Sequence, residues 1–510
     1  MSSAHTLSTA FLADLDAKSG NSSVARPSAV LRALPERAVQ FGTGAFLRGF
    51  VDAFIDAANR RGAFMGRVVA IGSTGSGRDR AFSDQDGLYT LIVAGVEHGA
   101  EVHERRIIGS VSRAISATTQ WQDVLACARD ANISVMFSNT TEAGIALDAR
   151  DATHAVTSVD APHSYPAKLA RFLYQCATEF NFDAQAGVVV VPCELLDANG
   201  AKLEALVREQ AAQWSLDARF GEWLTAAVPF CNTLVDRIVP GTPNVDAHVR
   251  LQAELGYDDA LLTMAEPYAL FAIEGDDALA DRLGFVDDTG MIRVVPDVGP
   301  YRERKVRLLN GTHTAMAALG VLAGVTTVHE AMHTPALAGM LQQLVMQDIL
   351  SVVDVPEATA FAEAVLDRFA NPQEQHQLTD IATQGTLKWK VRLLPVLQRH
   401  AARGAALLPA SLVHALAAQL YLAHPAQRAR RADAGIARFS DEMGELVLAH
   451  WVRSGATRMA VFADAVLGDV AIWETDLREI SGLVAALTES LQRLHDGGVL
   501  SLLSPSLVTS

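Results

Sequence analysis

Residues 40–48 read Gln-Phe-Gly-Thr-Gly-Ala-Phe-Leu-Arg, a Gly-x-Gly turn between a short apolar run and a helical pattern. The run 38–41 has the length of a buried strand, and apolar residues recur at helical spacing from Phe46 to Ile55. Glycines in such a turn let the backbone approach a pyrophosphate at the start of a helix. Leu47 replaces the third glycine of the usual fingerprint, so the turn alone also fits an ordinary loop, and its strand–helix setting favours the nucleotide interpretation.

Outward from this turn, strand and helix patterns alternate as far as about Leu196, which is typical of a parallel sheet. The strand candidates of this sheet are Ala38–Phe41, Val68–Ile71, Thr90–Val93, Ile133–Ser138 and Val188–Pro192. Two later strands, Tyr268–Ile273 and Met291–Val295, are expected to close this half of the chain.

After Lys305 the pattern changes to long amphipathic segments rich in Ala and Leu. These predict helices at 313–324, 334–352, 357–370, 409–422, 440–453, 458–467 and 478–494. We therefore predict an α/β, Rossmann-like dinucleotide-binding domain at residues 1–298, followed by a mostly α-helical domain at 299–510. The Ser- and Ala-rich residues up to about 27 are expected to form a mobile arm.

Composition excludes several classes of partner. The chain has 510 residues, 50% of them hydrophobic, and a formal net charge of −16, which opposes binding to nucleic acid. Its densest late basic run, Arg428 to Arg431, is expected to be a solvated turn between helices. The absence of a secretory pattern and of any window of about twenty apolar residues predicts a cytoplasmic protein with no membrane partner.

The four cysteines have no spacing that resembles a zinc site, and we expect reduced, mostly buried thiols.

Polar residues that follow the predicted strands are candidates for the dinucleotide site, because ligands of such sheets bind beyond the carboxyl ends of the strands. In NAD enzymes an acidic residue usually follows the second strand, yet no carboxylate appears here before Asp79. Small residues followed by Arg78 could tolerate a 2′-phosphate, so the sequence leaves NAD and NADP open. The loop after Ser138 is expected beside the nicotinamide ribose, although its polar residues could equally cap the next segment. The expected cofactor-binding residues are Phe41, Gly42, Thr43, Gly44, Ala45, Phe46, Arg48, Ser73, Arg78, Asn139, Thr140, Thr141 and Glu142.

The stretch 301–313, Tyr-Arg-Glu-Arg-Lys-Val-Arg-Leu-Leu-Asn-Gly-Thr-His, is the candidate for proton transfer. Three arginines flank Lys305, and neighbouring positive charge helps a lysine to give up its proton near neutral pH. On an α-helix, Lys305, His313 and Asn310 would point at roughly 0°, 80° and 140°, with about 12 Å along the axis between Lys305 and His313. The alternative is a solvated lysine, an Asn-Gly turn and a half-buried histidine.

Five segments together resemble the mannitol dehydrogenase family of polyol-specific long-chain dehydrogenases, over residues from about 35 to about 495. They are QFGTGAFLRGFVD (40–52), FSNTTEAGI (137–145), VVVPCELLDANG (189–200), FCNTLVDRIVPG (230–241) and PYRERKVRLLNGTHTA (300–315). The resemblance implies a metal-independent oxidoreductase that uses NAD, with NADP not excluded, and that acts as a monomer or small homo-oligomer. It also implies that Lys305 is the acid/base and that Asn310 and His313 hold the reacting oxygen.

One departure bears on the substrate. Polyol-oxidising members read S-C-D-N where this chain has Pro192-Cys193-Glu194-Leu195, so a second oxyanion asparagine falls on Leu195. Asn199 or Asn232 could complete that site instead. The departure favours the uronate branch of the family and a sugar-acid substrate.

A uronate carboxylate calls for a basic partner. The candidates are Lys388, which lies near a substrate-binding arginine of related enzymes, and its neighbours Lys390 and Arg392. Asp236 and Arg237 are expected either to orient substrate hydroxyls or to pair with each other. A related reductase or polyol dehydrogenase on the same scaffold stays open, as does, more remotely, a dinucleotide sensor without catalysis.

Overall fold

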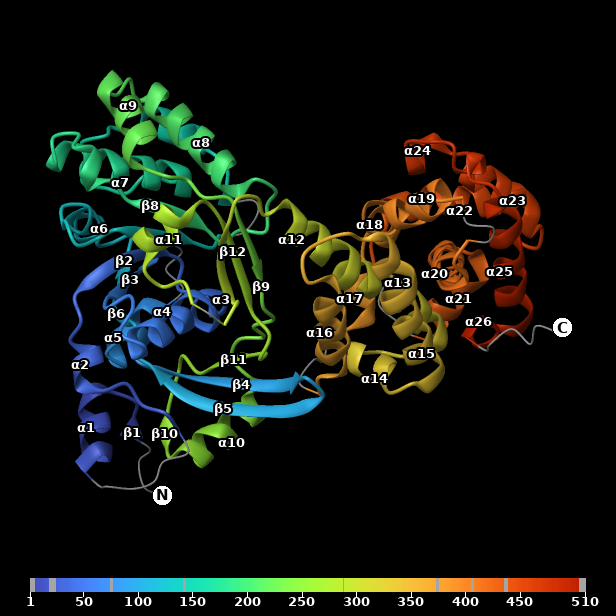
Figure 1. Ribbon diagram of the computed structural model, residues 1–510, viewed down its shortest axis with the longest axis horizontal. Helices are drawn as coiled ribbons and strands as arrows, with labels where there is room; N and C mark the ends of the chain where they lie inside the picture. The colour runs from blue at the N-terminus through green and yellow to red at the C-terminus, as the bar shows by residue number, and fades with distance from the viewer. Residues whose placement is uncertain are drawn as a thin grey trace. The chain divides into compact units, whose positions relative to one another are not determined.

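A five-stranded parallel sheet forms the centre of the first half of the chain (Figure 1). The computed structural model describes residues 5–17, 24–73, 77–140, 144–287, 289–372, 376–404, 408–434 and 439–503. Its central sheet has the order β6 (Val111–Ser116), β3 (Arg67–Gly72), β2 (Glu36–Phe41), β7 (Val135–Ser138) and β8 (Val189–Pro192). The order runs outward from β2 in both directions, as in doubly wound dinucleotide-binding sheets, and confirms the predicted Rossmann-like fold.

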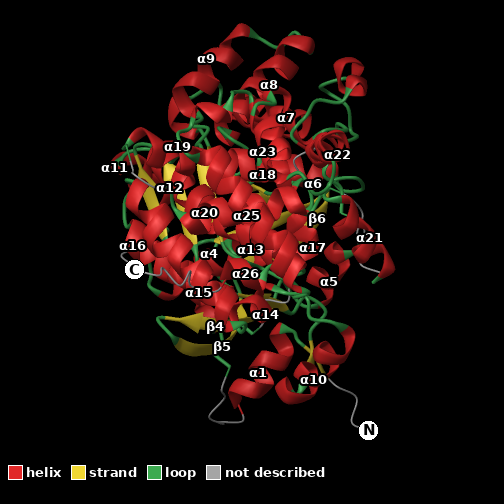
Figure 2. Ribbon diagram, turned by 90° about the vertical axis from the view of Figure 1, so that its right-hand side faces the viewer, coloured by secondary structure: helices red, strands yellow, loops and turns green. Residues whose placement is uncertain are grey.

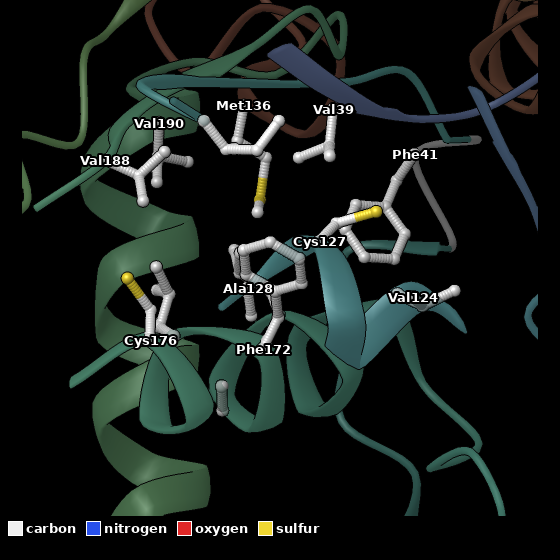
Figure 3. Packing of buried hydrophobic residues seen from close by; sticks show 14 of the residues in the cluster. Val39, Phe41, Val124, Cys127, Ala128, Met136, Phe172, Cys176, Val188 and Val190 are labelled. Carbon is white, nitrogen blue, oxygen red and sulfur yellow. The ribbon is translucent and has the colours of Figure 1, made fainter. Parts of the chain in front are cut away.

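Alternate residues of these strands bury opposite faces of the sheet, as the two-residue period of a strand requires. Val39, Met136 and Val190 lie on one face and pack against a cluster that includes Phe172 and Cys127 (Figure 3). The helices on this face are α6 (Trp121–Cys127), α7 (Tyr165–Glu179), α8 (Asn199–Gln213) and α9 (Ala218–Ala227).

The other face of the central sheet packs against α3 (Ala45–Gly49), α4 (Val51–Arg60) and a second sheet. This second sheet has the order β13 (Ile292–Val295), β12 (Leu270–Glu274) and β9 (Thr233–Asp236), with β12 antiparallel to β9. The two late strands were therefore located near their predicted positions, but they form a sheet of their own.

The prediction that Thr90–Val93 joins the central parallel sheet is wrong. This run lies in β4 (Tyr89–Glu97), which forms a separate sheet with β5 (Ala100–Ile108) and β11 (Thr263–Ala265). His98 and Gly99 both have positive φ, 51° and 72°, and make a two-residue hairpin turn. The hairpin gives β4 an immediate partner, drawn as two long paired arrows in Figure 1.

The first residues do not all form the expected mobile arm. β1 (His5–Thr6) pairs with β10 (Tyr257–Asp258), and α1 (Thr9–Ala17) follows it. Leu7 and Leu12 are fully buried in a small apolar cluster, so this stretch is anchored by burial of apolar surface.

By internal contacts the chain divides into two compact units. The first comprises Met1–Ala94 and Glu101–Val298, and the second comprises Gly95–Ala100 and Gly299–Ser510. Within the first unit, the remaining helices are α2 (Ala29–Arg32), α5 (Arg78–Asp84), α10 (Val245–Leu255) and α11 (Asp277–Leu283), with short 3₁₀ turns η2 (Ala149–Thr153) and η3 (Ala184–Ala186).

From Gly299 onward, every described element is helical apart from one bridge between Thr327 and Gln377 (Figure 2). The α-helices are α12 (Gly299–Arg304), α13 (Thr312–Ala323), α14 (Val328–Met332), α15 (Pro335–Gln343), α16 (Ala358–Ala370), α17 (Leu378–Ala382), α18 (Gly385–Arg392), α19 (Leu394–Ala402), α20 (Ala410–Tyr421), α21 (Pro425–Asp433), α22 (Glu442–Ser454), α23 (Met459–Leu467), α24 (Val470–Trp473), α25 (Leu483–Gly497) and α26 (Leu500–Leu503). The shorter segments are η4 (Lys305–Gly311), η5 (Leu344–Ile349), η6 (Leu350–Val352) and η7 (Leu477–Glu479).

Two predictions for this half need correction. The single helix expected at 334–352 is α15 followed by a π-helical segment, η5, and a 3₁₀ turn, η6. The basic run from Arg428 to Arg431 lies within α21 instead of a turn, and the guanidinium of Arg431 stacks on Phe439.

The four cysteines are free and buried, as predicted. No helix within the described ranges is long and apolar enough to cross a membrane.

Candidate functional site

The Gly-x-Gly turn brings its backbone against the next strands. Gly42 has φ +139° and donates its N–H to the carbonyl of Ile71 at 2.9 Å. A Cβ at Gly42 would lie 2.8 Å from Leu47 Cδ1 and 3.3 Å from the carbonyl oxygen of Asn139, so only glycine fits. Gly44 precedes α3 and has no atom within 4 Å of a built Cβ. The turn therefore offers bare backbone at a helix start, which suits a pyrophosphate.

A buried polar network supports this turn from within the domain. Gln40 donates to the carbonyl of Gly42 at 3.2 Å, and Arg48 donates to the carbonyl of Thr43 at 2.7 Å. Arg48 is only 3% exposed and also donates to Thr263 Oγ1 at 2.9 Å. The Arg48 guanidinium thus holds the turn. That Arg48 also contacts a cofactor stays a prediction.

Asp52 completes this network. Gln40 and the Tyr89 hydroxyl both approach Asp52 Oδ2, at 3.4 and 3.5 Å. Complete burial raises the pKa of Asp52 to about 7, against the opposing effect of Gln40, Arg48 and Tyr89. A carboxyl that is neutral below pH 7 and ionises around that pH therefore lies beneath the turn.

The aromatic residues of the predicted cofactor set are mainly core residues. Phe41 is fully buried with its ring centroid 5.1 Å from that of Tyr165, and Phe46 stacks on Phe50 at 4.9 Å. Phe41 reaches the turn through its backbone, since its carbonyl accepts from the Asn139 N–H at 3.2 Å.

The loop after β7 is held by a glutamate that the sequence analysis quoted but did not assign. Glu194 accepts from Ser138 Oγ at 3.1 Å and from the Thr140 N–H at 2.9 Å, and Asn139 Nδ2 donates to the Cys193 carbonyl at 2.8 Å. Burial raises the pKa of Glu194 despite these hydrogen bonds. The signal that could have identified it is a carboxylate directly after a buried strand. Thr141 and Glu142 lie outside the described residues.

At the end of β3, Ser73 is half-buried and Arg78, the first residue of α5, is exposed. The carboxylate of Asp79 lies directly against Gly72, the last residue of β3.

The candidate proton-transfer residues lie on a π-helical segment, η4, from Lys305 to Gly311. The prediction treated this stretch as an α-helix and separated Lys305 from Asn310 by about 140°. In a π-helix the hydrogen bonds join residues five apart, so Lys305 and Asn310 lie one turn apart on the same face. His313 follows in α13, with its ring centroid 4.4 Å from that of Phe369. All three side chains are half-buried.

The arginines around Lys305 are partnered by acceptors. Arg304 is buried, donates to the carbonyl of Pro356 at 2.9 Å and pairs with Glu357 at 3.3 Å. Arg307 pairs with Glu303 at 2.9 Å, and Arg399 approaches the same carboxylate at 2.6 Å. Burial would raise the pKa of Glu303, but the two arginines lower it overall. Much of the positive charge expected to act on Lys305 is thus compensated.

The three cations of α18 have different surroundings. Lys388 donates to the carbonyl of Ile381 at 2.9 Å, whereas Lys390 pairs with Glu474 at 2.9 Å. Arg392 donates to the carbonyl of Asn310 at 3.3 Å and to Thr314 Oγ1 at 3.1 Å. Burial lowers the pKa of Lys388 and lowers that of Arg392 to about 10. Arg392 is therefore the α18 cation that supports the π-helical turn.

The predicted substrate residues of the first unit are deeply placed. Asn199 is fully buried, donates to Thr233 Oγ1 at 2.9 Å and accepts from the Thr233 N–H at 2.9 Å. Arg237 donates to the carbonyls of Glu266 and Gly49, and burial lowers its pKa to about 10.

Asp236 is likewise buried, at the end of β9, and Asn232 donates to Glu274 at 3.0 Å. By contrast, Leu195 is 66% exposed. These contacts brace the domain, and substrate contacts of Asn199, Asp236 and Arg237 stay predictions.

Within the part of the chain that the structure describes, no group of three or more His, Cys, Asp and Glu side chains is placed to hold a metal ion.

Comparison with known proteins covers nearly the whole chain. The model of the mannitol dehydrogenase Rossmann domain matches residues 36–285, and that of the mannitol dehydrogenase C-terminal domain matches residues 297–495. Altronate oxidoreductase of Pectobacterium atrosepticum is 40% identical over 479 residues, which cover 91% of this chain and 96% of the relative. Altronate oxidoreductase of Bacillus subtilis is 37% identical over 466 residues, covering 91% and 94%.

Two solved structures share the fold. Mannitol 2-dehydrogenase of Pseudomonas fluorescens, in a ternary complex with NAD and D-mannitol, has a TM-score of 0.68 at 24% identity over 98% of both chains. A D-sorbitol dehydrogenase in substrate-free form has a TM-score of 0.78 at 20% identity, over 98% of this chain and 100% of the other. On the strength of both family models and the identity to relatives along its length, this chain belongs to the mannitol dehydrogenase family.

Proposed function

We propose that this protein is a tagaturonate reductase, also called altronate oxidoreductase, which interconverts D-tagaturonate and D-altronate with NAD(H). The observation that carries the proposal is the 40% identity to an altronate oxidoreductase over 91% of the chain. Function is not inferred from the fold alone, because one scaffold can serve several reactions.

The first unit contains what a dinucleotide needs. Gly42 and Gly44 leave the backbone bare at the start of α3, and Arg48, Gln40 and Glu194 hold the surrounding turns. When bound, NADH supplies the hydride for the keto carbon. We assign NAD as the cofactor, in keeping with the related mannitol 2-dehydrogenase solved with NAD.

The second unit contains the groups for the proton. In the reducing direction, the Lys305 ammonium donates a proton to the oxygen of the carbonyl as it becomes an alcohol. Asn310 lies one π-helical turn away on the same face and donates a hydrogen bond to that oxygen as negative charge develops. His313, whose ring lies against that of Phe369, positions the same oxygen or the adjacent hydroxyl.

The carboxylate of the substrate requires a cation with spare donors. Lys388 uses one of its three ammonium hydrogens on the carbonyl of Ile381, which leaves two for a substrate. Leu195 replaces an oxyanion asparagine of polyol-oxidising relatives and cannot donate a hydrogen bond. Both features favour a keto-uronate over a neutral polyol.

The test is initial-rate oxidation of NADH by the full chain with D-tagaturonate, D-fructuronate and D-fructose as alternative substrates. We expect the highest kcat/KM with D-tagaturonate. A higher value with D-fructuronate would move the assignment to the epimeric substrate, and a higher value with D-fructose would refute the sugar-acid assignment.

A further inference from the structure

His376 brings a second imidazole to the ring of His313. The two ring centroids lie 6.1 Å apart, and the rings are nearly perpendicular, at 80°. Phe369 lies against the same His313 ring, with a centroid distance of 4.4 Å. Because His376 is exposed, a molecule bound beside His313 can also reach His376. The ring that we assign to the reacting oxygen therefore has an imidazole next to it that has no role so far.

The backbone on both sides of His376 is fixed. An antiparallel bridge joins Gln377 to Thr327, in which the Val328 N–H donates to the His376 carbonyl at 3.1 Å and the Leu378 N–H donates to the Thr326 carbonyl at 2.9 Å. Leu378 begins α17, which packs closely on α13, the helix that carries His313 (Figure 1), because a Cβ built on its Gly320 would overlap Leu378 Cδ1. The position of His376 is thus set by main-chain hydrogen bonds that do not involve its side chain.

Lys388 lies close enough to act on the same imidazole. Desolvation by the atoms packed around the ring lowers the pKa of His376, Asp380 raises it, and the ammonium of Lys388 lowers it further. The net result is a pKa below the usual value, so His376 is neutral at neutral pH. His376 therefore adjoins both the residue assigned to the reacting oxygen and the residue assigned to the substrate carboxylate.

The substrate has hydroxyl groups on the carbons between its carbonyl and its carboxylate. D-Tagaturonate and D-fructuronate differ only in the configuration of one of these carbons. We propose that His376 is a further substrate-binding residue, which exchanges hydrogen bonds with a hydroxyl of this part of the sugar acid and so distinguishes the two epimers. The inference rests on the proposed function, because it requires a keto-uronate held between His313 and Lys388.

The chemistry of the ring favours a hydroxyl over the carboxylate as its partner. A neutral imidazole has one N–H donor and one acceptor nitrogen, which match a hydroxyl that also donates and accepts. A carboxylate only accepts, and Lys388 already offers it a charged donor. A site that hydrogen-bonds a particular hydroxyl discriminates against a substrate in which that contact is lost.

The experiment measures kcat/KM of the full chain with D-tagaturonate and with D-fructuronate at saturating NADH. The predicted quantity is the ratio between the preferred epimer and the other. His376→Ala should lower kcat/KM for the preferred epimer by roughly tenfold, mainly through KM, and that for the other epimer by less than about twofold, so the ratio falls about fivefold or more. NADH affinity, measured by fluorescence titration, should not change.

His376→Gln is the conservative variant, because its amide retains a donor and an acceptor at the end of the side chain. It should restore the ratio to within about threefold of the wild type. The matched control is His333→Ala, since His333 is likewise exposed and lies against a second histidine ring, that of His329, at 4.0 Å between centroids. This control should leave both kcat/KM values within about twofold of the wild type.

Equal losses with the two epimers in His376→Ala would overturn the inference, because the contact would then be to a group that the epimers share. Unchanged kinetics in His376→Ala would overturn it as well. Failure of the wild type to reduce either keto-acid would overturn the proposed function, whereas turnover with an unaltered ratio would overturn only the role of His376.

Discussion

The glycine turn of the first unit and the π-helical segment of the second unit are both departures from regular structure, but they are stabilised differently. Gly42 needs its positive φ, and Gln40 of β2 and Arg48 of α3 donate hydrogen bonds to carbonyls of the turn. Arg48 is itself held by donating to Thr263 of β11. The segment from Lys305 to Gly311 contains no residue with positive φ. Its support comes from Thr314 and Arg392, which both donate to the carbonyl of Asn310. A turn can thus be encoded locally by glycine, whereas a π-helix depends on partners elsewhere in the fold.

The largest expected effect is a loss of turnover, and it distinguishes the proton transfer assigned to the second unit from the cofactor binding assigned to the first. Lys305→Ala should lower kcat for D-tagaturonate reduction by roughly 10²- to 10⁴-fold, because the developing alkoxide loses its proton donor. Affinity for NADH should stay within about twofold, since the dinucleotide is assigned to the first unit. Stopped-flow turnover and NADH titration measure the two quantities. The exposed Lys202 on α8 provides the control as Lys202→Ala. Turnover within a few-fold of the wild type would contradict the role of Lys305.

The second effect concerns the buried carboxyl beneath the glycine turn. The pKa of Asp52 is raised from 3.8 to about 7, so the folded protein holds a proton that the unfolded chain releases between about pH 4 and pH 7. Stability therefore falls as the pH rises through this window and levels off above it. Asp52→Asn removes the titration, and the stability of the variant relative to wild type should improve from pH 4 to pH 7.5 by up to about 4 kcal/mol.

Urea unfolding followed by tryptophan fluorescence at several pH values measures this difference. Asp348, whose pKa burial also raises to about 7, provides the comparison in the second unit. It accepts from Ser411 and lies in the other π-helical segment, η5. Asp348→Asn should change the pH dependence in the same direction. Parallel stability curves for wild type and Asp52→Asn would show that Asp52 is ionised in the folded protein.

The third effect tests the support of the π-helix. Arg392→Gln shortens the donor that reaches the Asn310 carbonyl and Thr314, so Asn310 loses its fixed orientation. We expect kcat to fall by roughly tenfold or more, because a hydrogen bond from a charged donor contributes about 1.5–3 kcal/mol and those of Arg392 are partly buried. NADH affinity should not change.

Lys390→Gln on the same helix provides a stability control. Its partner Glu474 has 81% of its side chain exposed, and such a pair contributes about 0–1 kcal/mol. Equal losses of kcat and of NADH affinity in Arg392→Gln would indicate general unfolding and would contradict a positioning role.

The sequence predicted what is encoded locally. Four strands of the central sheet, β2, β3, β7 and β8, and the glycine turn were predicted because hydrophobic period and glycine placement need only neighbouring residues, whereas its fifth strand, β6 (Val111–Ser116), was not predicted. The partner of β4 was missed because an apolar run looks alike in any sheet, and the choice was made by the His98–Gly99 turn and by β11, about 170 residues later. The π-helical winding that aligns Lys305 with Asn310 was missed because no residue type signals it, and α-helical geometry was assumed.

The smallest expected effect shows whether the negative charge of Glu194 holds the loop after β7 or whether its hydrogen-bonding geometry is sufficient. Two of the donors to Glu194 are of unequal kind: the Thr140 N–H is fixed in direction, whereas the Ser138 hydroxyl can rotate and accept instead. In Glu194→Gln, the amide oxygen can face Thr140 and the amide nitrogen can face Ser138, which preserves both contacts. We therefore expect NADH affinity to fall by only about two- to fivefold in Glu194→Gln, and by about tenfold or more in Glu194→Ala, where the Thr140 N–H loses its acceptor.

Because burial raises the pKa of Glu194, the protonated acid already resembles the amide, and the difference between wild type and Glu194→Gln should shrink as the pH falls. If Glu194→Gln instead lost as much affinity as Glu194→Ala, the negative charge itself would hold the loop. The two regions would then share the same kind of support, since the π-helix also relies on a charged residue, Arg392.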